Sequence, residues 1–438
     1  MNRTVEKNKT LLVDGPASVI VTSGKVEVFG SLISNASRVV IREGKRLPFA
    51  VKEASNLEIS LGESGKTEEI DGDTIPPSWA ESCEELLKIH DKPVTAMVLG
   101  AVDSGKTSFC TYLANKALSQ KIQVAILDGD LGQSDVGPPG TISYAFMTKP
   151  TTDMFNASAK NAFFVGTTSP SACIDKALEG FCSLLKEVLA GHPDLVIVNT
   201  DGWVEGEEAV TYKRRLVEEM KPNMVFSLQQ KDELAPLLQV LEGFSVRIID
   251  SPLTARERSR EKRKSLRELG YRKYLRNAKV QSLPLGWVKI EDSELFGLGK
   301  KDGHTMQAKK VYELLGMKPL HFAELKDKLA VVIGRTRWIE GENIKKAEKF
   351  AGKKVVVYRK GDEKGVLTAL YGNDRKFLGI GVLQEIDYIR KTMKLLTPVS
   401  ADVSVVTLGE VKLDKNFKET PLFGEENQPG YPEFTKLL

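Results

Sequence analysis

The amino-acid sequence predicts an α/β protein in which a doubly wound, mainly parallel sheet lies between an N-terminal and a C-terminal all-β domain. Apolar and polar side chains alternate over residues 1–80, short apolar runs alternate with helical patterns over 93–253, and strand patterns return from residue 281. A chain of 438 residues is too long for one ordinary core. We expect domains at 1–80, 81–280 and 281–438.

The first domain is predicted from the stretch "SVIVTSGKVEVFGSLISNASRVVIREGKRLPFAV". Its apolar residues recur with a period of two, and Gly-Lys and Gly-Ser pairs interrupt the pattern at short intervals. This pattern is typical of half-buried strands joined by tight turns. We expect a small β-sandwich or barrel.

The middle domain is predicted from short apolar runs, which read "VTAMVLG", "VAILDGD", "AFFVGTTS", "LVIVNTDG", "MVFSLQQ" and "VRIIDSP". Amphipathic helical patterns such as "KTSFCTYLANKALSQ" separate several of them. Buried parallel strands alternating with helices form doubly wound sheets, in which ligands bind at the carboxyl ends of the strands. The last domain carries "KLAVVIGRT" and "KKVVVYRK", and a hairpin turn is expected at 372–374.

The composition is that of an ordinary globular protein, with 41% hydrophobic and 28% charged residues. No apolar run approaches the ~20 residues that span a bilayer, and the polar first residues do not resemble a signal peptide. The four cysteines form no C-x-x-C pair. We therefore expect a cytoplasmic protein with no membrane partner. Basic charge gathers at 254–279, where eleven Lys/Arg and three Asp/Glu give +8 against +4 for the chain.

The stretch "GAVDSGKTS" predicts a phosphate-binding P-loop, because it follows a predicted strand and opens a predicted helix. Backbone N–H groups of such a loop face the phosphates, and the helix N-terminus adds its dipole. Lys106 would place a charge at the β- and γ-phosphates, and the Thr107 hydroxyl would bind Mg²⁺. The predicted nucleotide site consists of Gly100, Ala101, Val102, Asp103, Ser104, Gly105, Lys106, Thr107 and Ser108.

Two carboxylates follow the next predicted strand, in "ILDGDLGQ". Asp128 and Asp130 fall on one side of an extended chain, where one would hold Mg²⁺ with Thr107 and the other would accept a proton from a hydroxyl group. The alternative is a pair that serves the metal only. Gln133 would orient a water molecule or the acceptor. A GTPase is disfavoured, because "LQQKDEL" lacks the guanine-specifying motif.

Together with "FVGTTSP" at 164–170, "NTDGWV" at 199–204 and "ERSREKRKSLRELGYRKYL" at 257–275, these motifs resemble the polynucleotide 5′-hydroxyl kinase family of RNA processing. The resemblance covers nearly the whole chain, including the order of β-domain, P-loop core and β-domain, and favours a single-chain archaeal member. It implies ATP and Mg²⁺ as cofactors and the 5′-OH end of RNA as acceptor, with DNA as a second acceptor. RNA-processing proteins are implied as further partners.

The resemblance also implies residue roles. Lys106 and Asp130 would be catalytic, with Asp130 activating the 5′-hydroxyl, and Arg258 and Arg263 would neutralise phosphate charge from a lid at 254–279. The implied metal ligands are Thr107, Asp128 and Asp130. Nucleic acid would be held by Gln133, Thr167, Thr168, Ser169, Trp203 and Arg263, with Trp203 stacking on a terminal base. The N-terminal domain would help to hold adenine, through residues that the sequence does not identify.

Two of these roles have plainer alternatives. Trp203 would be a core residue if its ring were buried, and the basic segment would be a solvated helix face if it contacted no ligand. Against the second alternative, Arg256, Arg260, Arg263 and Arg267 form one stripe on an ideal helix. Five residues separate Arg258 from Arg263, about 140° around such a helix, so we expect them to contact different phosphates.

The sequence thus favours an ATP-dependent polynucleotide 5′-hydroxyl kinase. Two alternatives are a scaffold subunit that holds ATP without turnover and an NTP-hydrolysing assembly factor whose only phosphate acceptor is water. The intact set of Lys106, Asp130 and Arg258 argues against the scaffold.

Overall fold

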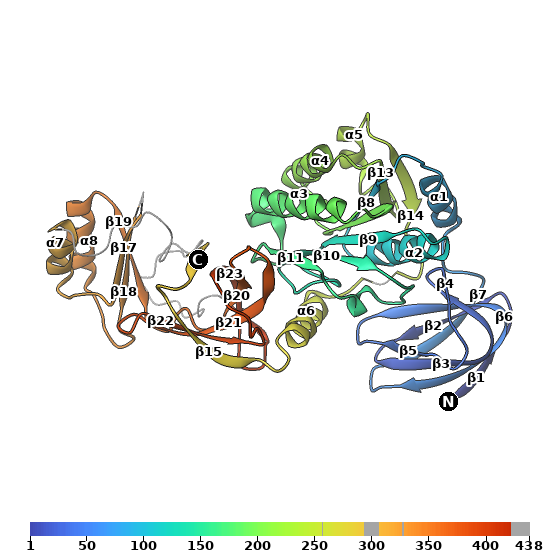
Figure 1. Cartoon of the computed structure of the whole chain (residues 1–438), viewed down its shortest axis with the longest axis horizontal. Helices are drawn as coiled ribbons and strands as arrows, with labels where there is room; N and C mark the ends of the chain where they lie inside the picture. The colour runs from blue at the N-terminus through green and yellow to red at the C-terminus, as the bar shows by residue number, and fades with distance from the viewer. Residues whose placement is uncertain (256, 293–305, 326–327, 422–438) are drawn as a thin grey trace. The chain divides into compact units, whose positions relative to one another are not determined.

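The computed structural model describes residues 1–255, 257–292, 306–325 and 328–421. The chain forms two compact units, Met1–Gly270 and Tyr271–Leu438. The boundary falls within helix α6 (Arg260–Tyr274). Figure 1 labels the helices and strands along the chain.

The first unit begins with a strongly curved antiparallel sheet, ordered β4-β3-β6-β2-β7, in which β1 also pairs with β6 and β5 with β3. The alternation in the sequence produces this sheet, because residues such as Val19, Val21 and Ile59 point inward and are almost fully buried. The strands are β1 (Asn2–Val5), β2 (Lys9–Asp14), β3 (Ala17–Val28), β4 (Ser31–Leu32), β5 (Arg38–Ile41), β6 (Arg46–Leu61) and β7 (Lys66–Asp71).

The core of the first unit is a sheet of order β11-β10-β9-β12-β8-β13-β14. Strands β9, β12, β8, β13 and β14 are parallel, whereas β10 and β11 form an antiparallel edge. The sequence did not reveal β10, and "AFFVGTTS" belongs to the antiparallel edge rather than to the parallel strands. The strands are β8 (Val94–Gly100), β9 (Val124–Gly129), β10 (Thr141–Met147), β11 (Asn161–Phe164), β12 (Leu195–Thr200), β13 (Met224–Gln229) and β14 (Val246–Asp250).

Helices cover both faces of this sheet, as Figure 1 shows. Helices α1 (Pro77–Leu87) and α2 (Lys106–Ser119) share a core with the N-terminal sheet, while α3 (Ile174–Ala190), α4 (Glu207–Met220) and α5 (Ala235–Val240) pack on the other face. Two short 3₁₀ turns, η1 (Met154–Asn156) and η2 (Pro170–Ala172), lie in connecting loops. The predicted fold class is confirmed: a doubly wound, mainly parallel core flanked by β-rich parts.

The second unit contains an antiparallel sheet of order β15-β22-β21-β20-β23-β16, with β24 paired to β23; only β16 joins in parallel. The predicted turn at 372–374 joins β20 to β21. The strands are β15 (Lys279–Pro284), β16 (Lys289–Glu291), β20 (Val366–Tyr371), β21 (Phe377–Asp387), β22 (Thr392–Thr397), β23 (Val405–Leu413) and β24 (Glu419–Thr420).

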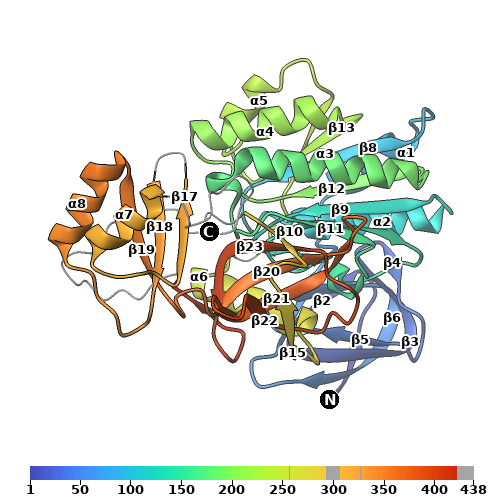
Figure 2. The ribbon, with the colours of Figure 1, turned by 60° about the vertical axis from the view of Figure 1, so that its left-hand side comes forward.

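Between β16 and β20 the chain forms a small α/β layer that the all-β expectation did not include. Its sheet, of order β17-β18-β19, carries both helices on one face, as Figure 2 shows. The elements are α7 (Met306–Leu315), β17 (His321–Glu324), β18 (Lys328–Ile333), α8 (Gly341–Ala351) and β19 (Lys354–Arg359). Among the described residues, no helix has the length and apolar character that crossing a membrane requires.

Candidate active site

The P-loop lies between β8 and α2, at the carboxyl edge of the core sheet. Gly105 caps α2 with a φ of 101°, a left-handed conformation that favours glycine, and Asp103 also has a positive φ of 61°. The Ser104 hydroxyl is buried and has no hydrogen-bond partner among the described residues. Such an orphaned donor in a loop with this backbone fits a phosphate oxygen.

Lys106 is 5% exposed, and its ammonium group donates a 2.7 Å hydrogen bond to the Ala101 carbonyl of the same loop. Burial lowers the pKa of Lys106, while the charge of Asp130 partly opposes this effect. A phosphate group would supply the missing counter-charge. The loop is therefore built to hold an anion.

The side-chain amide of Asn199 lies between Asp128 and Thr107 and donates a hydrogen bond to each. The Asn199 side chain at the end of β12 donates to the Asp128 carboxylate at 2.9 Å and to the Thr107 hydroxyl at 3.4 Å. The other Asp128 oxygen accepts bonds from the backbone N–H groups of Asp135 and Val136 at 2.8 and 3.1 Å. A buried carboxylate beside a hydroxyl is the oxygen-donor chemistry that Mg²⁺ prefers, so Thr107 and Asp128 fit this metal.

Asp130 differs from Asp128. One of its oxygens accepts bonds from the backbone N–H groups of Gly132 and Gln133 at 3.1 and 2.8 Å. Burial raises the pKa of Asp130 to about 6, against the influence of Lys106. A carboxylate with this pKa is ionised at neutral pH and still basic enough to accept a proton. Asp130 also lines the pocket, and can therefore reach an acceptor.

Gln133 lines the pocket, and its side chain also contacts the lid. Its amide nitrogen donates to the Gly132 carbonyl at 2.6 Å and to the Arg263 carbonyl at 3.0 Å. In this arrangement Gln133 joins the Asp130 loop to helix α6.

The lid contacts the P-loop through one carboxylate. Arg258 donates to Asp103 from its backbone N–H at 2.8 Å and from its guanidinium at 2.7 Å, and the Arg263 guanidinium lies 3.4 Å from the same carboxylate. Ideal helix spacing does not apply to this pair, because α6 begins at Arg260 and Arg258 precedes it. Both arginines converge on Asp103, and their contact with different phosphates stays a prediction. Arg256 lies outside the described residues.

The segment predicted to grip the substrate lies beside the Asp130 loop. A Cβ atom on Gly132 would lie 3.0 Å from the Thr168 carbonyl oxygen, so the two loops are in contact. Thr167 is buried and its hydroxyl donates to the Ser169 carbonyl at 2.6 Å, which shapes the segment internally. Thr168 and Ser169 are more accessible and remain the better candidates for contact with a ligand.

Trp203 is half-buried, with its ring stacked on Tyr212 at a centroid distance of 5.9 Å and an angle of 25°. Its loop lies against the P-loop, because a Cβ on Gly202 would come within 2.6 Å of Val102. The sequence therefore placed Trp203 correctly at the carboxyl edge of β12. A ring supported on one side by another ring suits a stacking platform.

Asp201 organises this loop, although no pattern in the sequence singles it out. It accepts bonds from the Trp203 backbone N–H at 3.0 Å and from the Tyr212 hydroxyl at 3.2 Å. The Lys213 ammonium donates to its carboxylate at 2.7 Å and to its carbonyl at 3.0 Å. Lys213 is 0% exposed, so this ion pair is part of the interior.

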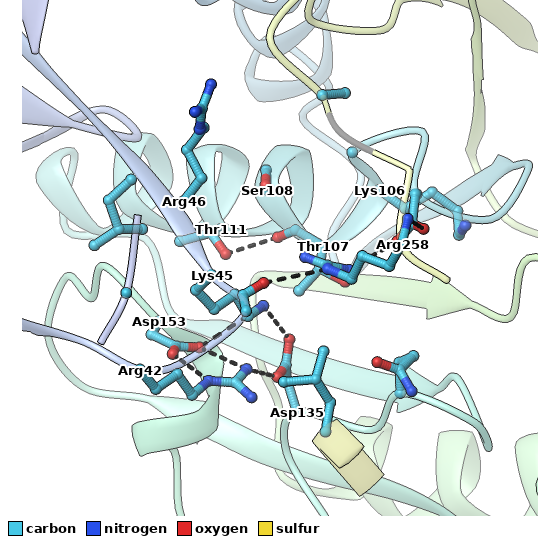
Figure 3. Close-up of a pocket in the computed structure, with 18 of the residues that line it drawn as sticks. Arg42, Lys45, Arg46, Lys106, Thr107, Ser108, Thr111, Asp135, Asp153 and Arg258 are labelled. Atoms are coloured by element: carbon cyan, nitrogen blue, oxygen red, sulfur yellow. Dashed lines mark hydrogen bonds and ion pairs between the residues drawn. The ribbon is translucent and has the colours of Figure 1, made fainter. Parts of the chain in front are cut away.

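The N-terminal sheet contributes basic residues to the same pocket, as Figure 3 shows. The pocket has a volume of about 490 Å³. Arg42 forms ion pairs with Asp135 and with Asp153, the latter at 2.6 Å, and the Lys45 ammonium lies 2.8 Å from Asp135. Burial opposes ionisation of Asp135, but Arg42 and Lys45 outweigh it and hold the pKa of that carboxyl below its usual range. Arg46 also lines the pocket. In the sequence, these pocket residues are marked only by the basic cluster "REGKR", and the carboxylates that Arg42 and Lys45 contact lie far along the chain.

The comparisons with known proteins agree with this geometry. Residues 100–277 match the family model of the mRNA cleavage and polyadenylation factor CLP1 P-loop. A polyribonucleotide 5′-hydroxyl-kinase of Pyrococcus abyssi is 31% identical over 355 residues, which are 80% of this chain and 96% of that relative. A protein of the same name from Methanocaldococcus jannaschii is 27% identical over 353 residues, 78% of this chain and 93% of the relative.

Among solved structures, Clp1p in its complex with a Pcf11p fragment has a similar fold. The TM-score is 0.65 at 14% identity, and the match covers 94% of this chain and 97% of that one. The fold, the order of the site motifs and the sequence match to the Pyrococcus abyssi protein together show that this chain belongs to the CLP1-type polyribonucleotide 5′-hydroxyl-kinase family.

Proposed function

We propose that this protein transfers the γ-phosphoryl group of ATP to the 5′-hydroxyl end of a polynucleotide. The observation that carries the proposal is that Lys106, Asp130 and Arg258 line one pocket at the carboxyl edge of the core sheet. A phosphate-binding lysine and a lid arginine would be enough for hydrolysis. A buried carboxylate with its pKa raised to about 6 adds the base that an alcohol acceptor needs.

In the proposed reaction the 5′-oxygen forms a bond to the γ-phosphorus as the bond to the β,γ-bridging oxygen breaks, and ADP leaves. Asp130 accepts the proton of the hydroxyl. Lys106 and Arg258 line the same pocket and would stabilise the negative charge on the transferred group electrostatically. Thr107 and Asp128 would hold Mg²⁺, which neutralises charge on the nucleotide when bound.

Trp203 would stack on the terminal base, and Thr168 and Ser169 would hold the phosphate next to it. A stacked base contributes about 1–3 kcal/mol to the binding of a single strand. RNA is the proposed acceptor because the relatives named above are polyribonucleotide kinases, and DNA is tested as the alternative. A cytoplasmic location and association with RNA-processing proteins complete the proposal.

The decisive experiment measures transfer of labelled γ-phosphate to matched RNA and DNA oligonucleotides that carry a 5′-hydroxyl. The same oligonucleotides with a 5′-phosphate are the control, since they offer no acceptor. The proposal is supported if the 5′-OH RNA becomes labelled and the 5′-phosphate control does not. ATP hydrolysis without labelled nucleic acid contradicts it and favours the assembly factor, and absence of any turnover favours the scaffold.

The variant Lys106→Ala controls for a contaminating kinase. It removes the ammonium group from the phosphate loop, and we expect transfer to fall at least about 100-fold, as when one preorganised electrostatic contact to the transition state is lost. Folding is checked by circular dichroism. Transfer near the wild-type rate by a folded Lys106→Ala protein would place the activity elsewhere.

A further inference from the structure

The small α/β layer between β16 and β20 carries a second concentration of basic charge that the proposed function does not use. Residues 328–364 contain eleven Lys/Arg and five Asp/Glu, a net charge of +6. Positive charge therefore gathers in a second segment besides 254–279. The second segment did not stand out in the sequence because its charges are interleaved with two buried strands and a helix.

The topology of this layer brings two loops together at one edge. Strands β18 and β19 are parallel and in register from Lys328 with Lys354 to Ile333 with Arg359. The loop after β18 and the loop after β19 therefore leave the sheet side by side. A hydrogen bond of 2.8 Å from the Lys360 N–H to the Ile333 carbonyl joins the first residue after β19 to the last residue of β18. This is the edge at which parallel sheets commonly bind ligands.

These loops present an aromatic ring among guanidinium groups. Trp338 is 61% exposed, and the Arg359 guanidinium lies 5.2 Å from the centre of its ring. Arg335 and Arg337 are exposed on the same short loop. We name the four residues Arg335, Arg337, Trp338 and Arg359 the Trp338 patch. A tryptophan ring held by an arginine and largely open to solvent offers a face on which a planar group can stack.

Asp362 and Glu363, the acidic residues of the loop after β19, accept hydrogen bonds from backbone N–H groups of their own turn. Asp362 accepts a 3.0 Å hydrogen bond from the Arg359 backbone N–H, and Glu363 accepts one of 2.8 Å from the Gly361 N–H. Both carboxylates thus serve the turn in which they lie. Arg335 and Arg337 are exposed cations beside an exposed ring, which matches a polyanion carrying planar groups better than it matches an apolar protein surface.

We propose that the Trp338 patch binds single-stranded RNA, with a base stacked on Trp338 and backbone phosphates paired with Arg335 and Arg337. The proposal rests on the proposed function only in that the substrate is a polynucleotide. Stacking and phosphate pairing together are how proteins hold single strands without reading their sequence. The patch would therefore add affinity for the body of a long RNA and leave the chemistry at its 5′ end unchanged.

The test compares the full-length variants Trp338→Ala and Arg335→Ala/Arg337→Ala with two matched controls. Trp287→Ala removes another exposed tryptophan of the same unit, 81% exposed, and Lys345→Ala/Lys346→Ala removes the same charge from the exposed side of α8. Binding of a 3′-labelled, 30-nucleotide 5′-OH RNA is measured by fluorescence anisotropy without ATP, over a series of salt concentrations. Phosphate transfer is measured over a series of RNA lengths.

We expect Trp338→Ala to weaken binding of the 30-nucleotide RNA at least about fivefold, the lower range for one lost stack. The double arginine variant should reduce the slope of log K against log salt by about 1.4, since about 0.7 is lost per unpaired phosphate of a single strand. The shortest accepted RNA should be phosphorylated at the wild-type rate by all variants. The two controls should bind as the wild type does.

The proposal would be overturned if both patch variants bound RNA as tightly as the wild type, or if patch and control variants lost the same affinity. A protein partner would then remain as the occupant of the patch. An equal loss for short and long RNA would overturn it too, because the effect would then lie at the active site. The two proposals fail separately. Wild-type protein that binds RNA through the patch but transfers no phosphate contradicts only the proposed function.

Discussion

At the scale of single residues, the site separates two carboxylates that are two positions apart in the sequence. Asp128 receives hydrogen bonds from Asn199 and from backbone N–H groups, which fix it in place. Asp130 receives fewer, and burial raises the pKa of both carboxyls, that of Asp130 to about 6. The spacing of the residues predicted the pair without separating the two roles, and only the family resemblance pointed to Asp130 as the base. That distinction depends on contacts with residues 132–136 and 199, which only the folded chain brings together.

The raised pKa of Asp130 predicts opposite effects of Asp130→Asn on activity and on stability. Transfer should be lost, and in the wild type kcat/KM should fall about tenfold per pH unit below about 6, as the base becomes protonated. The folded protein binds this proton more tightly than the unfolded chain does. The protonated Asp130 carboxyl therefore stabilises the folded protein below pH ~4, and this stabilisation is lost as pH rises through about 6.

At pH 8 the asparagine variant should then be more stable than the wild type, by about 1–3 kcal/mol, and the difference should vanish near pH 4. The stability difference is measured by urea unfolding at pH 4 and pH 8. The loss of the base is measured from kcat/KM over a pH series. A kcat/KM that stays level from pH 5 to pH 8 would contradict the role of Asp130 as base.

The buried ion pair of Asp201 and Lys213 leads to a second prediction at this scale. Asp201→Ala leaves the Lys213 ammonium in the interior without its partner, which should cost about 3–5 kcal/mol of stability. The control is Arg214→Ala, which breaks an exposed pair with Glu218 and should cost less than about 1 kcal/mol. Both are measured by thermal or urea unfolding.

The same variant also tests whether Asp201 positions Trp203. We expect the KM for the oligonucleotide to rise more than the KM for ATP, because the hydrogen bond from the Trp203 backbone N–H to Asp201 is lost. Equal changes in both KM values would show that Asp201 serves stability alone.

At the scale of elements, the lid and the P-loop are joined by Asp103, a residue of the P-loop itself. The sequence predicted a basic helix over 254–279, but the helix begins at Arg260, and residues before it form the contact. Ideal helix spacing could not predict this, because Arg258 lies before the helix and contacts Asp103 and, at 3.2 Å, the Gly44 carbonyl. The phosphates of a bound nucleotide would compete with Asp103 for both arginines.

This arrangement predicts different effects for the two lid arginines. Arg258→Ala should reduce kcat, by up to the ~1,000-fold or more associated with an arginine that stabilises the transferred phosphoryl group. Arg263 lies farther from Asp103, and its guanidinium also donates a 2.7 Å bond to the Arg258 carbonyl. Arg263→Ala should therefore have a smaller effect on kcat and raise the KM for RNA. Steady-state kinetics over a salt series separate the two, and changes in KM alone for both variants would identify a binding surface rather than a catalytic lid.

At the scale of the whole molecule, the fold class and the order of motifs could be predicted because each depends on local patterns. Apolar runs mark the strands, and the P-loop, the Asp128–Asp130 segment and Trp203 all follow strand ends. What escaped prediction depends on partners distant in sequence. Arg42 meets Asp135 and Asp153 only after the N-terminal sheet packs against the core, and β10 is recognisable only from its pairing with β9 and β11.

The Arg42 contacts predict how the N-terminal sheet and the core stabilise each other. Arg42→Met removes the closest cation from Asp153 and leaves Lys45, 4.0 Å from Asp153 and 2.8 Å from Asp135, as the remaining cation, and should cost about 3–5 kcal/mol at pH 7. The pKa of Asp135 is held below its usual range, so this stability is present above pH ~4 and lost as pH falls through the folded-state pKa. Arg46→Met is the control, since Arg46 pairs with Asp14 inside the N-terminal sheet. Equal losses for both variants in urea unfolding would contradict a special role for Arg42.

The strand order of the second unit has a consequence for how the protein is made. Strand β15 pairs with β22, so that Lys279 lies opposite Thr397, and β23 lies between β16 and β20. On a ribosome, β15 and β16 leave the exit tunnel long before these partners are translated, and synthesis at about 5–20 residues per second leaves them waiting for several seconds. The layer containing α7 and α8 is contiguous in sequence and can fold during that interval. Premature termination before β23 would leave open strand edges, and such a fragment should aggregate or be degraded rather than accumulate.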